Sequence, residues 1–170
     1  MRLLAASLPM LALFALAPEE SLARKSDREQ SISLSASGFD GILAEDGDTL
    51  VTDLIITQGT LRIEAKKGTV TRKNGDFARI VLEGTPAMME QENDDGVPMK
   101  ARALRIDYDP VNDTVKLTGE VAIDQGADSF RGESVDYDIG SGRMKADGGT
   151  GRIQMTVQPR KKSAPDSQGG

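Results

Sequence analysis

Two pairs of carboxylates stand at the alternate spacing that places both members on one face of a β-strand. Asp107 and Asp109 form the first pair, and Asp136 and Asp138 form the second. A glycosidase could use such a pair as general acid and nucleophile. In both segments, however, the carboxylates alternate with aliphatic and tyrosine side chains. Because alternate residues of a strand point to opposite faces, the simplest interpretation is a solvated polar face without a catalytic role.

Metal and cofactor chemistry find little support in the sequence. The acidic segments 45–48 and 93–96 lack the alternating oxygen ligands and the distant glutamate of a calcium loop, and they are typical of hairpin turns. The chain has no histidine and no cysteine, which excludes a Ser-His-Asp triad, a Cys-His pair, an imidazole metal site and disulfides. We therefore predict no catalytic residue, no metal and no cofactor, and we do not expect an enzyme.

The first 23 residues have the features of a secretory signal. Arg2 is followed by an almost wholly apolar run from Leu3 to Ala17, and the small residues Ser21 and Ala23 stand at the −3 and −1 positions of a cleavage site. The apolar run is short for a membrane span. We predict that segment 1–23 is cleaved on export. The net charge of −6 argues against nucleic acid as a partner.

The rest of the chain is predicted to form one domain with polar ends. Segment 24–30 is charged and is expected to be a flexible lead-in, while segment 159–170 lacks apolar residues other than Ala164 and is expected to be a disordered polar tail. Segment 31–158 is dense in turn signals, which leaves no room for a helix of ordinary length. This pattern places the domain in segment 31–158.

One alternating segment occurs twice. Residues 50–59 and residues 117–126 each alternate apolar and polar positions into a Gln-Gly turn, and each is followed by a second alternating run. This is typical of a strand, a turn and a returning strand. The predicted fold class is therefore all-β, with roughly a dozen short, mostly antiparallel strands and no substantial helix.

The alternation gives the predicted sheet one apolar face. Aromatic residues make up only 4% of the chain, so this face is mostly aliphatic. Composition leaves two interpretations open: a thin but complete core, or a groove that holds an apolar guest.

Four segments resemble the OstA-like LptA family, which forms the periplasmic bridge for lipopolysaccharide transport. They are the run 56–65, the Gly-Thr-Pro-Ala step at 84–87, the Leu-Thr-Gly-Glu-Val motif at 117–121 and the run 130–137. The similarity extends from about Ile32 to Val157. One departure is Thr52-Asp53, where the family and the second repeat of this chain have glycine followed by a polar residue. Since threonine lacks the backbone freedom of glycine, the local geometry there is expected to differ.

The resemblance implies a fold, a ligand and partners. The fold would be an open, twisted antiparallel β-jelly roll, or β-taco, whose apolar groove holds the acyl chains of lipid A. In the periplasm, protomers would join head to tail through terminal strands 31–36 and 151–157, linking an inner-membrane-anchored OstA-like partner to an outer-membrane translocon. The groove residues are expected from the alternation and, for Ile32, Leu34, Met89 and Tyr108, from the resemblance. The full set is Ile32, Leu34, Leu54, Ile56, Leu61, Ile63, Met89, Leu104, Ile106, Tyr108, Leu117, Val121 and Ile123.

A binding module of another class is the competing interpretation. An exported structural β-solenoid or a carbohydrate-binding module would also be all-β. A carbohydrate-binding module would be expected to display exposed aromatic platforms, and this chain has few aromatic rings.

Overall fold

The computed structural model describes residue 27 and segments 29–41, 46–93 and 95–158. The predicted signal segment 1–23 and the predicted tail 159–170 lie outside the described residues. Part of the predicted lead-in is described and contacts the domain. The Asp27 carboxylate accepts hydrogen bonds from the backbone N–H and the hydroxyl of Thr60, at 3.2 and 2.6 Å.

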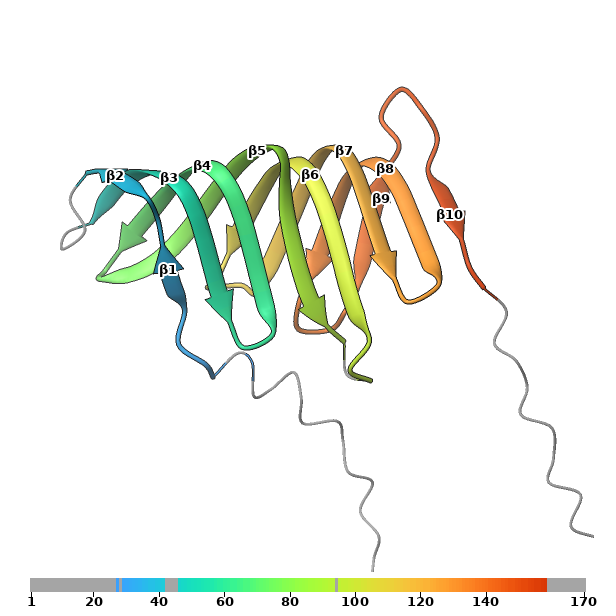
Figure 1. The fold of residues 1–170 in the computed structure, drawn as a ribbon, viewed down its shortest axis with the longest axis horizontal. Helices are drawn as coiled ribbons and strands as arrows, with labels where there is room; N and C mark the ends of the chain where they lie inside the picture. Colours follow the sequence, from blue (N-terminus) through green and yellow to red (C-terminus); the bar gives the residue numbers. More distant parts are fainter. Residues whose placement is uncertain (1–26, 28, 42–45, 94, 159–170) are drawn as a thin grey trace, which may run out of the picture.

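The described residues form one antiparallel sheet (Figure 1). Its order is β1-β3-β4-β5-β6-β7-β8-β10, with β2 paired to β3 and β9 paired to β8. The strands are β1 (Ser33–Ser35), β2 (Gly38–Asp40), β3 (Gly47–Gln58), β4 (Leu61–Lys73), β5 (Asp76–Glu92), β6 (Pro98–Asp109), β7 (Thr114–Gln125), β8 (Asp128–Asp138), β9 (Met144–Asp147) and β10 (Gln154–Thr156). The all-β prediction is confirmed, and the described part of the chain contains no helix that could span a bilayer.

The prediction of about a dozen short strands was wrong in one respect. Strands β3 to β8 are long, from 11 to 17 residues each. Each contains two runs of alternation that the sequence presents separately, because the pattern is interrupted near the middle of the strand.

These interruptions lie in one row across the sheet, which we call the crease. The pairing of neighbouring strands skips a few residues at corresponding places. Bulges bend a strand and increase its twist, so a row of them folds the whole sheet along one line. The crease consists of Asp53, Lys66, Gly84–Pro86, Leu104, Gly119–Glu120 and Glu133.

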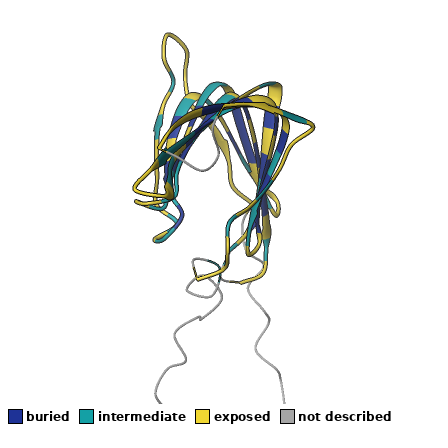
Figure 2. Ribbon diagram, turned by 90° about the vertical axis from the view of Figure 1, so that its left-hand side faces the viewer, coloured by how far each residue is buried: buried dark blue, intermediate teal, exposed yellow. Residues whose placement is uncertain are grey.

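The crease divides the long strands into two facing walls. Wall A contains the segments next to the β3–β4, β5–β6 and β7–β8 hairpins, namely 54–58, 61–65, 87–92, 98–103, 121–125 and 128–132. Wall B contains the other halves, namely 47–52, 67–73, 76–83, 105–109, 114–118 and 134–138. Viewed along the sheet, the walls are joined on one side and separate on the other, and both contain buried residues (Figure 2).

Left-handed backbone conformations occur at the crease in both repeats. Asp53 has φ of 47° and Glu120 has φ of 50°, while Gly119 has φ of 80°. Aspartate is one of the residues that adopts this region with least strain. Thr52-Asp53 thus makes its interruption through Asp53, even though the glycine of the second repeat is missing. The Asp53 carboxylate accepts hydrogen bonds from Lys66 Nζ and Ser37 Oγ, at 2.8 and 2.9 Å, which lower its pKa.

One expected groove residue does not face the interior. Leu104 is 41% exposed, whereas Ala103 and Ile106 on either side of the interruption are buried. The expected parity of Leu104, Ile106 and Tyr108 assumed an unbroken strand. The register shift between Arg102 and Arg105 moves the alternation by one residue, so Leu104 leaves the inner face.

Candidate functional site

The inner faces of the two walls share a single cluster of buried apolar side chains. Most of the expected groove residues belong to it: Leu54, Ile56, Leu61, Ile63, Met89, Ile106, Tyr108, Leu117, Val121 and Ile123. Ile32 and Leu34 are partly buried and pack against the same cluster. Apart from Leu104, the residues selected from the sequence are therefore brought together between the walls.

Further members of the cluster were not among the candidates. They are Val51, Ala65, Val70, Ile80, Leu82, Ala87, Met99, Ala101, Ala103, Val115, Phe130, Val135, Tyr137 and Ile139. Many of them lie in wall B. Alternation within each half-strand is the signal that could have found them. Ile80 and Leu82, for example, have the parity opposite to that of Arg79 and Glu83. To apply this signal, one must know where the crease changes which alternate residues face inward.

A hydrogen bond joins the two walls at their open edges. The Tyr108 hydroxyl, near the end of β6 in wall B, donates to Oε1 of Gln58 at the end of β3 in wall A, at 2.6 Å. The side chain of Tyr108 is fully buried. Burial and the nearby negative charges of Asp113 and Asp109 raise the pKa of Tyr108 to about 12. The phenol is therefore neutral near pH 7 and remains able to donate.

Further toward β8, the edges of the two walls enclose a cavity of about 250 Å³. Met99 and Gln125 contribute to it from wall A, and Tyr137 from wall B. Met144 of β9 and the loop residues Asn93 and Asp95 complete the lining with Ser141 and Gly142. Two members of the interior cluster, Met99 and Tyr137, are thus reached from the open side at this end of the sheet.

The apolar interior continues to both ends of the sheet. Leu34 of β1 is paired with the inward residue Ile56, and Met155 of β10 is paired with the inward residue Phe130. Leu34 is partly buried, whereas Met155 is 65% exposed. Since β10 is the last strand of the sheet within the described residues, Met155 extends the apolar inner face to the edge of the described sheet.

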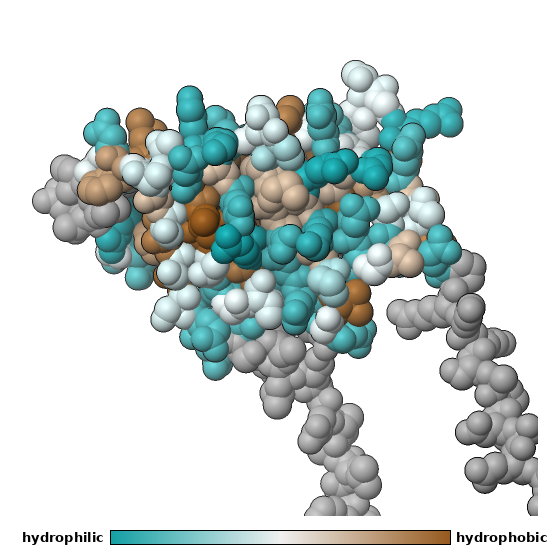
Figure 3. Space-filling view, viewed as in Figure 1, coloured by the Kyte–Doolittle hydropathy of each residue, from teal (hydrophilic) through white to brown (hydrophobic). Residues whose placement is uncertain are grey.

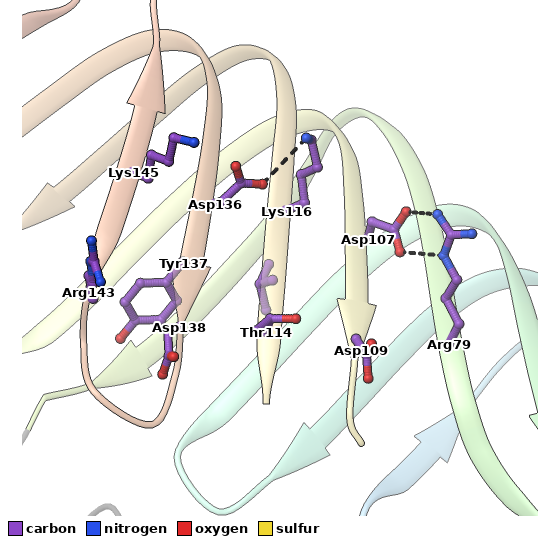
Figure 4. Close-up of a pocket in the computed structure, with 11 residues that line it drawn as sticks. Arg79, Asp107, Asp109, Thr114, Lys116, Asp136, Tyr137, Asp138, Arg143 and Lys145 are labelled. Atoms are coloured by element: carbon purple, nitrogen blue, oxygen red, sulfur yellow. Dashed lines mark hydrogen bonds and ion pairs between the residues drawn. The ribbon is translucent and has the colours of Figure 1, made fainter. Parts of the chain in front are cut away.

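The outer face of wall B carries paired charges (Figure 4). Asp107, Lys116, Asp136 and Lys145 occupy one register row across β6, β7, β8 and β9, and their charges alternate. Arg79 forms an ion pair with Asp107, with Nε 2.8 Å from Oδ1, and Lys116 Nζ lies 3.4 Å from Asp136 Oδ1. Exposed pairs of this kind contribute about 0–1 kcal/mol each to stability.

The second member of each carboxylate pair has a turn role. Asp109 Oδ1 accepts from the backbone N–H groups of Val111 and Asn112, at 3.0 and 2.9 Å. Asp138 Oδ1 accepts from the N–H of Ser141 at 2.8 Å. The four carboxylates thus form ion pairs between strands or hydrogen bonds within turns on the outer face, which agrees with the solvated interpretation.

Polar and charged side chains cover much of the outer surface, with smaller apolar patches between them (Figure 3). Within the described segments, no cluster of three or more potential metal ligands is found. The apolar interior between the walls is therefore the feature of the described molecule that best suits a ligand, and that ligand would be apolar.

Comparisons with known proteins show what this chain is similar to. Residues 45–143 match the family model of the LptA/(LptD N-terminal domain) LPS transport protein. The chain is 28% identical to the lipopolysaccharide export system protein LptA of Haemophilus influenzae, over 94% of this chain and 95% of that protein. It is 31% identical to the lipopolysaccharide export system protein LptH of Pseudomonas aeruginosa, over 88% of this chain and 91% of that protein.

A solved structure shares the fold. The crystal structure of LptH, described as the LptA homologous periplasmic component of the lipopolysaccharide transport device of Pseudomonas aeruginosa, matches with a TM-score of 0.71 at 28% identity. The match covers 79% of this chain and 99% of that one. These are transport proteins and not enzymes, in agreement with the absence of a predicted catalytic site. The chain therefore belongs to the LptA/(LptD N-terminal domain) family of lipopolysaccharide transport proteins.

Proposed function

We propose that this protein carries the acyl chains of lipopolysaccharide between its two walls, in the periplasm. The observation that carries the proposal is the single apolar cluster between walls A and B, against which Leu34 of β1 packs and which the exposed Met155 of β10 continues beyond Phe130. The names of the relatives support lipopolysaccharide as the cargo and the periplasm as the location.

The hydrophobic effect explains why such a carrier is needed. Each methylene group exposed to water costs about 0.8 kcal/mol, so an acyl chain of about a dozen methylenes costs roughly 10 kcal/mol in the aqueous periplasm. An aliphatic interior removes most of this cost. Because contacts between aliphatic groups are non-directional, the chain can slide along the interior toward an end.

The two edges of the sheet suit an end-to-end assembly. β1 and β10 are the terminal strands of the sheet order, and each pairs with only one other strand among the described residues, which leaves its other side for backbone pairing. The edges differ from each other, so their pairing is heterologous and extends into a filament. In this proposal the filament links an inner-membrane-anchored partner of the same fold to an outer-membrane translocon, with the interiors of successive protomers in line.

Site-specific photo-crosslinking in cells tests the cargo. A photoreactive residue at Leu34, which packs against the interior, should capture lipopolysaccharide. The same residue at the neighbouring Ser35, which is exposed, should capture little. Both positions lie in β1, so the pair differs in the direction of the side chain and not in the strand.

Equal capture at the two positions would contradict a groove between the walls. Capture of no lipopolysaccharide at Leu34, in a variant that still supports growth, would contradict the proposed cargo itself.

A further inference from the structure

One polar side chain lies within the apolar interior without a hydrogen-bond partner among the described residues. Gln91 is only 3% exposed, and neither its Nε2 nor its Oε1, both buried, is paired with any part of the chain that the structure describes. A buried amide that makes no hydrogen bond destabilises the folded protein, because it has given up its bonds to water. One explanation for such a group is a ligand that forms the missing hydrogen bonds.

The position of Gln91 in the sheet directs its side chain inward. Ala87 and Met89 precede it at alternate positions of β5 and are fully buried members of the interior cluster. Its cross-strand partner is Met99 of β6, which also belongs to the cluster. The amide therefore stands among apolar side chains on the inner face of wall A.

Gln91 also lies close to the open edge of the interior. It is the last residue but one of β5, which ends at Glu92. Met99, its cross-strand partner, lines the cavity between the edges of the walls. A lipid whose head group stays outside would place the first few carbons of an acyl chain, and not its methyl end, near this amide.

We propose that Gln91 forms a polar subsite that receives the hydroxyl group of a hydroxylated fatty acyl chain. The inference rests on the proposed function, since it assumes that acyl chains occupy the interior. A hydroxyl both donates and accepts, so it can bind either Oε1 or Nε2–H of the amide. A plain acyl chain would leave both atoms unpaired.

A neutral amide suits a hydroxyl group better than it suits a charged ligand group. It offers directional bonds but no net charge, so it cannot compensate a phosphate or a carboxylate in an apolar space. The single bond discriminates between chains while leaving most of the contact aliphatic. Gln91 would thus set which acyl chains are preferred, and the surrounding cluster would supply the general affinity.

Calorimetry with two fatty acids tests the subsite. Purified protein is titrated with 3-hydroxytetradecanoic acid and with tetradecanoic acid, both below their micelle concentrations. The wild type should bind the hydroxylated acid about five- to tenfold more tightly, the effect of one net hydrogen bond. Gln91→Met keeps a long side chain without the amide and should bind both acids with equal affinity.

A second glutamine provides the matched control. Gln154 in β10 is exposed and belongs neither to the interior cluster nor to the cavity between the walls, so Gln154→Met should retain the preference. Thermal unfolding without ligand gives an independent readout, since Gln91→Met should melt higher once the unpaired amide is gone.

The possible failures are distinguishable. Equal affinity of the wild type for the two acids, or a preference that persists in Gln91→Met, would overturn the subsite and leave the acyl-chain groove standing. Failure of the wild type to bind either acid would overturn the groove together with the subsite.

Discussion

Tyr108 is a residue at which the two walls are tied to each other. It was expected to face inward, and it does so at full burial, but its hydrogen bond to Gln58 on the opposite wall could not be read from alternation. Alternation assigns a face to a residue and says nothing about what lies across the interior. The bond spans the open edge, so its loss would allow the walls to separate there.

Alkaline titration tests the state of this phenol. The pKa of Tyr108 is raised to about 12, above an ordinary value near 10, so the folded state holds the proton more tightly than the unfolded state. Its contribution to stability is complete below about pH 10 and is lost as the pH rises toward 12, by up to about 2 kcal/mol. We expect a late phenolate transition at 295 nm that is absent in Tyr108→Phe.

The chain has only two tyrosines, so the assignment is direct. Urea unfolding at pH 9 and pH 11.5 should show a larger loss of stability in the wild type than in Tyr108→Phe. Equal losses would mean that Tyr108 is not buried as a neutral donor.

At the scale of the elements, the crease is the feature that turns a sheet into two walls. Every long strand contributes an interruption to it, although the sequences at these places differ widely. In β5 the crease is the Gly84–Pro86 segment, which Gly84 allows to fold closely on itself. A Cβ on Gly84 would lie 2.6 Å from the backbone nitrogen of Ala87 and 2.8 Å from the carbonyl of Pro86.

Gly84→Ala should therefore destabilise the fold. The neighbouring atoms belong to the backbone and cannot rotate away, so we expect a loss of about 1–3 kcal/mol in the free energy of unfolding. Chemical denaturation measures it. The matched control is Gly38→Ala in β2, where the new Cβ would meet its nearest neighbour, Thr52 Cβ, at 4.0 Å and should change stability by less than about 0.5 kcal/mol. Equal effects of the two substitutions would show that the close approach at Gly84 is not needed.

At the scale of the whole molecule, the uncovered β10 edge governs assembly in our proposal. Ile153, Met155 and Val157 are exposed apolar residues at this edge, and Met155 continues the inner face of wall A beyond Phe130. A second protomer that docks its β1 edge here would cover them and bring its Leu34 next to Met155.

Met155→Asp should weaken end-to-end association at least about tenfold, which corresponds to about 1.4 kcal/mol, because association would bury an unpaired carboxylate. Gln154→Asp adds the same charge at a neighbouring residue of the opposite parity and should have a smaller effect. Sedimentation velocity over a range of concentrations measures both. Each variant should have the circular dichroism spectrum of the folded wild type, since both residues are exposed. An association that is equally strong in Met155→Asp and the wild type would contradict this edge as the contact.

The sequence by itself determined the strand class and the apolar and polar faces, and its lack of histidine and cysteine excluded the catalytic sites that need them. These follow from period-2 alternation and residue types, which are local properties. The tertiary structure decided where the alternation is reset, since bulges are set by the pairing of neighbouring strands. Leu104 was misplaced for this reason. Three features depend on residues far apart in the chain, and only the folded sheet brings these residues together. They are the arrangement of the two walls opposite each other, the Tyr108–Gln58 hydrogen bond and the burial of Gln91.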